Sequence, residues 1–220
     1  MNLLFDLDGT LTDPALGITR CLVHACERLG APVPSPDVLA SYIGPPLHGT
    51  FRKLLATDDD QAVADAVAAY RERFTSVGLY ENTLIEGIPT VLRELQRSGH
   101  RLWVATSKPH VYANRIIDHF DLRPFFLKVY GAELDGTRSA KAELLGHLLS
   151  TEALQASETL MVGDREHDVL GARAVGVRAI AVRWGYGSDE ELAAAAPAWL
   201  VHRPNEIPDV IAAAAAERLG

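Results

Sequence analysis

The fold of this 220-residue chain follows from one stretch near its start, LLFDLDGTLTD at residues 3–13. Its first three residues predict a short buried β-strand, and Gly9 predicts the turn that ends the strand. Residues two apart on an extended chain point to the same face, so the side chains of Asp6 and Asp8 start about 6–7 Å apart. Carboxylates that close repel each other unless a cation lies with them or one is protonated. We therefore expect metal-assisted chemistry at the end of this strand.

The composition limits the classes of partner. With 48% hydrophobic residues the chain can bury roughly 70% of its unfolded surface, which fits one domain with a sizeable insertion. The formal net charge is −8 and no cluster of Lys and Arg stands out. Binding to nucleic acid needs a basic face, so no nucleic-acid partner is expected. A small phosphorylated metabolite remains compatible, because a local pocket can be positive on an acidic protein.

Cysteines and apolar runs bear on the compartment. The two cysteines, Cys21 and Cys26, are five residues apart on different faces of a predicted helix, which indicates reduced thiols rather than a disulfide or metal site. Acidic residues from position 6 onward leave no room for the apolar region of a signal peptide. The longest apolar run, Leu192–Val201, is too short to span a bilayer. We expect a cytoplasmic protein with no membrane partner, and both monomer and homodimer stay open.

Residues 14–80 predict an inserted helical cap. Helical spacing relates the apolar residues of its first helix, which Gly30 ends: Ile18, Cys21, Leu22, Ala25 and Leu29. Two further helices are predicted over 47–55 and 61–74, and no strand is predicted in this region. An all-helical block of this length between two strands is typical of a cap.

The rest of the chain, residues 1–13 and 81–220, predicts the catalytic core. Strands and helices alternate, with strands over 101–105, 127–130, 159–162 and 179–182 and helices over 88–97, 111–119, 140–149 and 167–175. Such alternation predicts an α/β fold, a Rossmann-like parallel sheet with helices on both faces. Ligands of such sheets bind beyond the carboxyl ends of the strands. The alanine-rich tail, residues 190–220, predicts one terminal helix that serves for packing.

Polar residues follow the predicted strands at the ends that a parallel sheet brings together. The second strand runs into residues 106–108, the helix after the third carries Lys141, and the fourth runs into residues 163–168. We therefore expect four carboxylates, two hydroxyls and two lysines in one crevice: Asp6, Asp8, Asp164, Asp168, Thr106, Ser107, Lys108 and Lys141. Such a set suits Mg²⁺ and a phosphoryl group.

The charges suggest how the two first acids divide the work. Asp6, directly off the strand, is the better nucleophile and would form an aspartyl-phosphate. Asp8 would protonate the leaving oxygen and later deprotonate the water that cleaves the intermediate. A carboxylate that attacks a phosphate dianion is repelled by it, and bound Mg²⁺ relieves that repulsion.

The remaining residues complete the predicted site. Asp164 would join Asp6 and Asp8 as a metal ligand, with Asp168 as an indirect, water-mediated partner. The predicted phosphoryl-binding residues are Thr106, Ser107 and Lys141. Lys108 would either contact substrate or organise the site together with Asp168.

Four motifs in order resemble those of the haloacid dehalogenase superfamily, specifically its phosphatase branch. They are the segment Asp6–Asp13, Thr106-Ser107, Lys141, and Gly163-Asp164 with Asp168. The resemblance covers essentially the whole chain, and residues 14–80 fall where that family places its first type of cap. One departure is that Lys141 is not followed by the proline found in many relatives, which makes Lys108 a competitor for its role.

The chain is most similar to phosphoglycolate-phosphatase-like members of that superfamily. This closer resemblance lies in Thr106–Pro109, Gly163–Arg165 and Gly44–Leu47. It implies a Mg²⁺-dependent phosphatase that hydrolyses a small, phosphoglycolate-like monoester through an aspartyl-phosphate. Because similar proteins include nucleotidases and pyrophosphatases, a 5'-nucleotidase or pyrophosphatase is the alternative. A phosphoryl-transfer mutase and a non-catalytic phosphate-binding regulatory protein are more distant alternatives, and Asp8 argues against the binder.

Several polar residues have simpler interpretations. Arg165 and His167 are interpreted as solvated residues of a first helical turn, and Trp184–Gly187 as a tight turn. Four basic residues of the cap are candidates for contact with a substrate anion, and the sequence does not rank them: Arg20, His48, Arg52 and Lys53.

Overall fold

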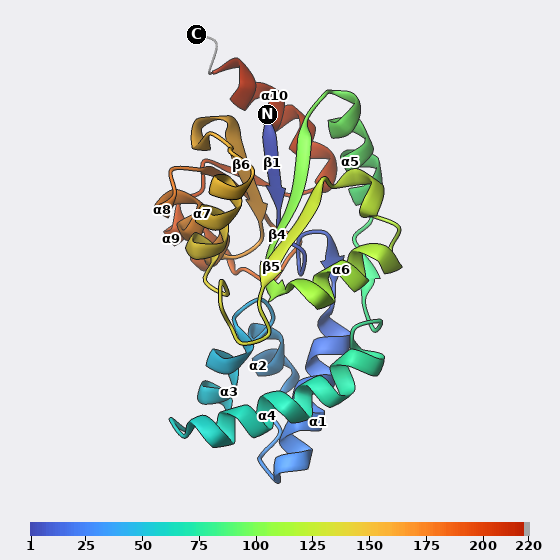
Figure 1. The fold of residues 1–220 in the computed structure, drawn as a ribbon, viewed down its shortest axis with the longest axis vertical. Coiled ribbons are helices and arrows are strands. Elements are labelled where there is room, and N and C mark those ends of the chain that lie inside the picture. Colours follow the sequence, from blue (N-terminus) through green and yellow to red (C-terminus); the bar gives the residue numbers. More distant parts are fainter. Residues whose placement is uncertain (218–220) are drawn as a thin grey trace.

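A six-stranded sheet forms the centre of the computed structural model, which describes residues 1–217 (Figure 1). The strand order is β5-β4-β1-β6-β7-β8, and every neighbouring pair is parallel. The strands are β1 (Asn2–Phe5), β4 (Arg101–Pro109), β5 (Lys128–Ala132), β6 (Thr159–Gly163), β7 (Arg178–Val182) and β8 (Trp199–Val201). The predicted Rossmann-like parallel sheet is confirmed, and the first strand of the chain lies in its middle.

Helices cover both faces of the sheet, so β1 is buried on both sides. Leu3 and Phe5 pack into the apolar cluster on one face, and Leu4 packs into the cluster on the other. The first face carries α5 (Ile88–Arg97), α6 (His110–His119) and α10 (Ile207–Ala216). The second face carries α7 (Lys141–Thr151), α8 (Glu166–Ala174) and α9 (Asp189–Ala195).

The helical insertion, residues 14–80, lies beyond the carboxyl edge of the sheet, toward which the strands point (Figure 1). Its helices are α1 (Ala15–Leu29), α2 (Pro36–Ser41), α3 (Leu47–Leu55), α4 (Asp60–Arg73) and the π-helical turn η1 (Phe74–Gly78). The predicted helices over 47–55 and 61–74 are present, and Gly30 ends α1 in the left-handed conformation. The short helix α2 was not predicted, since its six residues follow a proline-rich loop.

The chain crosses between sheet and insertion twice, through segments we call the neck, residues 12–17 and 78–84. Within it β2 (Thr12–Asp13) pairs with the antiparallel β3 (Thr83–Leu84). A Cβ on Gly17 would lie 2.0 Å from the carbonyl oxygen of Gly78, so the two segments touch backbone to backbone. Glu81 binds Arg73 through both carboxylate oxygens, at 2.6 and 3.0 Å, and Arg20 at 2.6 Å. The neck is therefore tightly held.

The C-terminal tail contains more than the single predicted helix. It holds α9, strand β8, a 3-10 turn (Pro204–Glu206) and α10. Strand β8 was missed because only three residues, inside an alanine-rich stretch, pair with β7. The last three positions of the predicted tail, 218–220, lie outside the described residues. Among residues 1–217 no helix combines the length and apolar character that crossing a membrane requires.

Candidate active site

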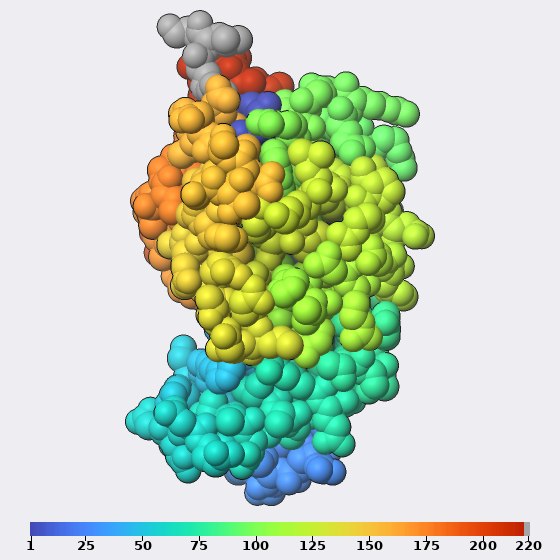
Figure 2. All heavy atoms as spheres, viewed as in Figure 1, coloured from blue at the N-terminus to red at the C-terminus, as the bar shows by residue number. Residues whose placement is uncertain are grey.

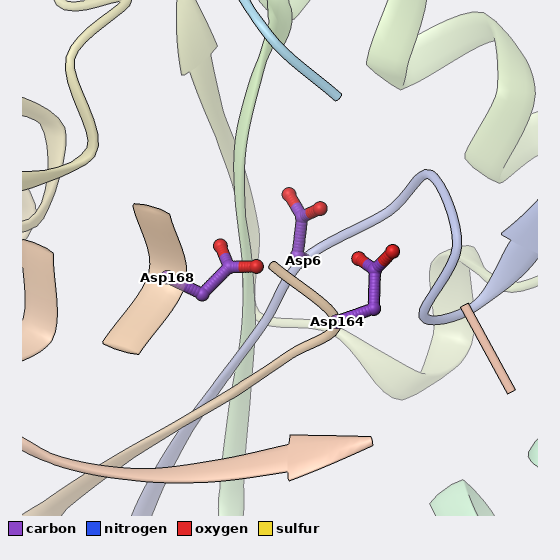
Figure 3. Close-up of side chains that lie close together, drawn as sticks. All are labelled: Asp6, Asp164 and Asp168. Atoms are coloured by element: carbon purple, nitrogen blue, oxygen red, sulfur yellow. The ribbon is translucent and has the colours of Figure 1, made fainter. Parts of the chain in front are cut away.

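Three carboxylates meet at the carboxyl ends of the central strands (Figure 3). Asp6 follows β1, Asp164 follows β6, and Asp168 lies in the first turn of α8. Each offers an oxygen, and these oxygens all lie within 4.8 Å of one another. All three residues are buried, and the parallel pairing continues past β1, where Asp6 N donates to the Val162 carbonyl at 2.9 Å. Of the four acids predicted to share one crevice, the structure thus places these three close enough to hold one cation together.

Asp164 is held by two loops that are distant in sequence. The Thr10 hydroxyl donates to its Oδ1 at 3.2 Å, and the backbone N–H of Tyr186 donates to its Oδ2 at 2.8 Å. Close approach of the second loop requires Gly185, where a Cβ would lie 2.2 Å from the Asp164 Cβ. The segment predicted as a tight turn therefore supports a site residue. Burial, together with the charges of Asp168 and Asp6, raises the pKa of Asp164 well above its ordinary value.

Lys141 joins two of the acids from the N-terminal end of α7. Its ammonium lies 2.9 Å from Asp6 Oδ1 and 2.7 Å from Asp168 Oδ1, and donates to the Ala105 carbonyl at 2.9 Å. Burial opposes its charge, but the carboxylates of Asp168 and Asp6 prevail and raise the pKa of Lys141. Burial also raises the pKa of Asp168, against the opposing effect of Lys141. A buried charged lysine at this position can meet an incoming anion.

Asp8 has a different partner. Lys108 Nζ lies 2.7 Å from Asp8 Oδ2, and 4.8 Å from the centre of the Phe74 ring. The other oxygen, Asp8 Oδ1, is buried and has no hydrogen-bond partner among the described residues. Burial raises the pKa of this carboxyl despite the nearby lysine. Lys108 therefore pairs with Asp8. Of its two predicted roles, organising the site with Asp168 is not what the structure shows, because Lys141 pairs with Asp168 instead; contact with substrate remains a prediction.

The three grouped acids fit a hard divalent cation. Carboxylate oxygens are the ligands that Mg²⁺ prefers, and the raised pKa values of Asp164 and Asp168 reflect buried like charges that a cation would relieve. The group comprises Asp6 and Asp164 as predicted, with Asp168 in addition. The side chain of Asp8 lies outside this group, and its assignment as a metal ligand remains a prediction.

A small cavity, here the acid cavity, opens among these residues. It is lined by Asp6, Asp8, Gly44, Thr106, Ser107, Lys108, Lys141, Arg165, His167 and Asp168. The predicted phosphoryl-binding residues therefore share one cavity with the predicted nucleophile. A register irregularity in the pairing of β4 with β5 falls between Thr106 and Pro109, at the residues that border this cavity.

Arg165 differs from its interpretation as a solvated residue. Its side chain is only 13% exposed, and its Nε donates to Glu191 at 2.7 Å. Its Nη1 donates to the carbonyl of Ile43 at 2.5 Å, which connects the loop after β6 with the insertion. His167 borders the same cavity but is exposed, as interpreted from the sequence. The position of Arg165 between Asp164 and Asp168 was the available signal for its place at the site.

A larger cavity of about 290 Å³, here the aromatic cavity, lies between the core and the insertion. Asp8, Ser107 and Lys108 border it from the core side. Four aromatic side chains border it, from the residue after α2 and from α4, η1 and α6: Tyr42, Tyr70, Phe74 and Tyr112. Tyr70 stacks on Phe74, with 5.3 Å between the ring centres. Phe74 meets Tyr112 edge to face at the same distance between ring centres.

Contacts across this cavity hold the insertion against the core. Arg71 Nη2, on α4, donates to the carbonyl of Leu134 at 2.7 Å, and Figure 2 shows the segment around residue 134 (yellow) resting on the insertion (cyan). Of the four basic candidates named from the sequence, His48 borders the cavity. The others do not: Arg20 pairs with Glu81, Arg52 pairs with Asp60, and Lys53 is exposed.

Comparisons with known proteins agree with this architecture. Residues 3–182 match the model of the haloacid dehalogenase-like hydrolase family. The chain is 51% identical over 196 residues to a 5'-nucleotidase of Pseudomonas aeruginosa, covering 89% of this chain and 88% of that protein. It is 27% identical to a phosphoglycolate phosphatase of Vibrio parahaemolyticus, with 96% of each covered. The crystal structure of a predicted phosphatase from Clostridium acetobutylicum superposes with a TM-score of 0.91 at 36% identity, covering 96% of this chain and 97% of that one.

Proposed function

The chain belongs to the haloacid dehalogenase-like hydrolase family, and from that premise we propose a Mg²⁺-dependent phosphomonoesterase that works through an aspartyl-phosphate on Asp6. The family match and its phosphatase relatives identify the enzyme class. The observation that supports the covalent mechanism is the place of Asp6. It lies at the end of the central strand, grouped with two buried acids and 2.9 Å from a lysine ammonium.

The first step is an attack of the Asp6 carboxylate on phosphorus, with cleavage of the ester P–O bond. Asp8 gives its proton to the departing oxygen, so the leaving group is released as an alcohol. Burial raises the pKa of Asp8, which favours a protonated carboxyl, and its Oδ1, unpartnered among the described residues, is available to hold the proton. In the second step Asp8 takes a proton from water, the water oxygen attacks phosphorus, and cleavage of the P–O bond to Asp6 releases inorganic phosphate and regenerates the Asp6 carboxylate. Lys141 and Ser107 hold phosphoryl oxygens during both steps.

The metal site would consist of Asp6 and Asp164, with Asp8 as the third predicted ligand. Bound Mg²⁺ supplies positive charge that lessens the repulsion between the Asp6 carboxylate and a phosphate dianion. Asp168, ion-paired with Lys141, holds that lysine in place rather than contacting the phosphoryl group.

The helical insertion would serve as a cap that holds the leaving group and excludes water. Its aromatic residues border the cavity next to Asp8, whereas the acid cavity is lined by residues of the core apart from Gly44. Leaving-group selection would therefore fall mainly to residues 14–80, and the phosphoryl chemistry to the strand ends.

The aromatic cavity favours a nucleoside monophosphate as substrate. Three carboxylates border it, those of Asp8, Glu133 and Asp135, and Asp8 neutralises Lys108. An uncharged leaving group with a planar ring fits this lining better than the anionic glycolate, because the rings can stack on it. The 51% identical relative is named a 5'-nucleotidase. A phosphoglycolate-like substrate, the expectation from the sequence, is the second candidate, since Arg71 could meet its carboxylate.

Phosphate release from a substrate panel tests this proposal. Purified protein is assayed with nucleoside monophosphates, phosphoglycolate and p-nitrophenyl phosphate, each with Mg²⁺ and with EDTA. We expect turnover that requires Mg²⁺ and a higher kcat/KM for nucleotides than for phosphoglycolate. A preference for phosphoglycolate overturns the substrate assignment alone. Turnover that EDTA leaves unchanged contradicts the metal, and the absence of phosphate release from every ester contradicts the enzyme.

A further inference from the structure

We propose that Arg71 makes this site select 6-oxopurine nucleotides, such as GMP and IMP, over AMP. This inference rests on the proposed nucleotidase function and adds the edge of the base that is recognised. It starts from one group without a partner: among residues 1–217 the buried Nε of Arg71 has no hydrogen-bond partner, although the residue borders the aromatic cavity.

The Arg71 guanidinium has more N–H donors than the described structure pairs with acceptors. A guanidinium carries five N–H donors in a fixed planar fork and no acceptor. Among residues 1–217, Arg71 forms a hydrogen bond from Nη2 to the Leu134 carbonyl, and it takes part in no ion pair with these residues. A buried N–H without a partner costs free energy, which an acceptor on a ligand would recover.

The acids that border the same cavity do not supply that acceptor. Glu133 is engaged by Arg138 and by His110, whose Nδ1 lies 3.3 Å from Oε2. Asp135 Oδ1 accepts a hydrogen bond from the backbone N–H of Thr137 at 2.9 Å. Asp8 pairs with Lys108. None of these three acids forms a hydrogen bond with Arg71 in the described structure, which leaves its free donors to acceptors on a ligand.

The neighbouring rings indicate what carries those acceptors. Tyr70 lies directly before Arg71 on α4, and it stacks on Phe74, which borders the cavity with Tyr112. A purine can stack on such rings while one edge faces the guanidinium. The 6-oxopurine edge offers two adjacent acceptors, O6 and N7, which match the arginine fork. Adenine places an amino donor at the same position, opposite the donors of Arg71, and is disfavoured.

Kinetics with matched nucleotides test the inference. For the wild type we expect kcat/KM for GMP and IMP to exceed that for AMP by roughly 10- to 100-fold, mostly through KM. In Arg71→Met the ratio should fall to within about threefold, and Arg71→Lys should keep part of it. The matched control is Arg28→Met, an exposed arginine elsewhere in the insertion, which should retain the wild-type ratio.

The possible outcomes distinguish the role of Arg71 from the proposed nucleotidase function. A wild type that hydrolyses GMP and AMP equally well overturns the role of Arg71 and leaves the nucleotidase standing. An Arg71→Met protein that loses activity on both nucleotides in parallel, with the ratio kept, shows a structural role and also overturns it. Hydrolysis of p-nitrophenyl phosphate without any nucleotide turnover overturns the nucleotidase itself. Because Arg71→Met could unfold, competitive inhibition of the wild type by inosine and adenosine gives a second readout, and equal inhibition contradicts the inference.

Discussion

Lys141 Nζ donates a 2.9 Å hydrogen bond to Oδ1 of Asp6, and both residues are buried at the carboxyl ends of the central strands. The proposed nucleophile is therefore oriented before any substrate arrives, which lowers the entropic cost of reaching the reactive geometry. The same ammonium also lies beside the place where phosphoryl oxygens would sit. Orientation and charge stabilisation thus come from one side chain.

Replacing the nucleophile should abolish turnover. Asp6→Asn removes the carboxylate proposed to attack phosphorus, so we expect kcat/KM with p-nitrophenyl phosphate to fall by at least about 10³-fold. Phosphate release and circular dichroism together check that activity, not the fold, is lost. Asp209→Asn, an exposed aspartate in the first turn of α10, is the control and should keep full activity. Activity of Asp6→Asn above one tenth of the wild type would contradict a covalent mechanism on this residue.

Asp8→Asn should separate the two steps. Nitrophenolate leaves without a proton, so formation of the aspartyl-phosphate should continue, while its hydrolysis lacks the base that activates water. We expect a burst of about one nitrophenolate per protein in rapid-mixing experiments, followed by slow turnover. With an alkyl phosphate, whose leaving oxygen needs the proton, the burst should be absent. Equal losses on both esters without a burst would remove Asp8 from acid and base catalysis.

Gly185→Ala should weaken metal binding without touching a ligand. The added Cβ would lie 2.2 Å from the Asp164 Cβ, so the loop must withdraw its Tyr186 N–H from Asp164 Oδ2. Loss of such support typically costs 10- to 100-fold in metal affinity, and we expect a shift of about that size in the Mg²⁺ concentration for half-maximal activity. Gly49→Ala is the control, since its Cβ meets nothing within 4 Å. An unchanged Mg²⁺ titration for Gly185→Ala would contradict the supporting role of the loop.

Arg165→Met should loosen the insertion from the core. It removes the hydrogen bond from Nη1 to the Ile43 carbonyl, so the closed arrangement over the site becomes less populated. We expect KM to rise about tenfold with a smaller change in kcat, measured by steady-state kinetics. Glu191→Gln serves as the comparison, because it alters the other partner of Arg165 and leaves the Ile43 contact. A larger effect from Glu191→Gln would assign the role to the core contact instead.

The neck should show acid-dependent stability. Arg73 and Arg20 bind Glu81 and lower its pKa to about 2, so the carboxylate is favoured in the folded state. Its contribution is therefore complete above about pH 4.5 and disappears as the pH falls toward 2. Glu81→Gln should lower the free energy of unfolding by about 1–2 kcal/mol at pH 7, and by much less at pH 2.5. Urea unfolding at the two pH values measures this, and an equal difference at both would contradict it.

The sequence was most informative where a single strand decides the geometry. Asp6 and Asp164 each follow an apolar run, and parallel pairing of β1 with β6 is enough to bring them together. The hydrogen bond from Tyr186 to Asp164 could not be predicted from strand order in this way. It joins residues 22 apart through a loop with no periodic pattern, and only its glycines hinted at close approach.

The aromatic cavity was likewise beyond sequence reasoning. Its rings come from residues 42, 70, 74 and 112, which belong to three separate stretches of the chain. At helical spacing, aromatic residues are typical of ordinary core packing, and Tyr70 is indeed also part of the apolar core. For the two lysines of the site, the sequence predicted the location but not the ion-pair partners. Lys108 and Lys141 were both placed at the site, but their partners depended on helix and strand positions that no motif spacing specifies.

The neck has a consequence for how such an enzyme can diversify. Within the described residues the backbone passes between the insertion and the sheet only through residues 12–17 and 78–84, and β2 and β3 hold these two segments side by side. A different helical block grafted between these points would inherit an intact set of strand-end residues, since none of those lies between 17 and 78. New substrates can thus be acquired by exchanging one contiguous module while the inherited chemistry stays untouched.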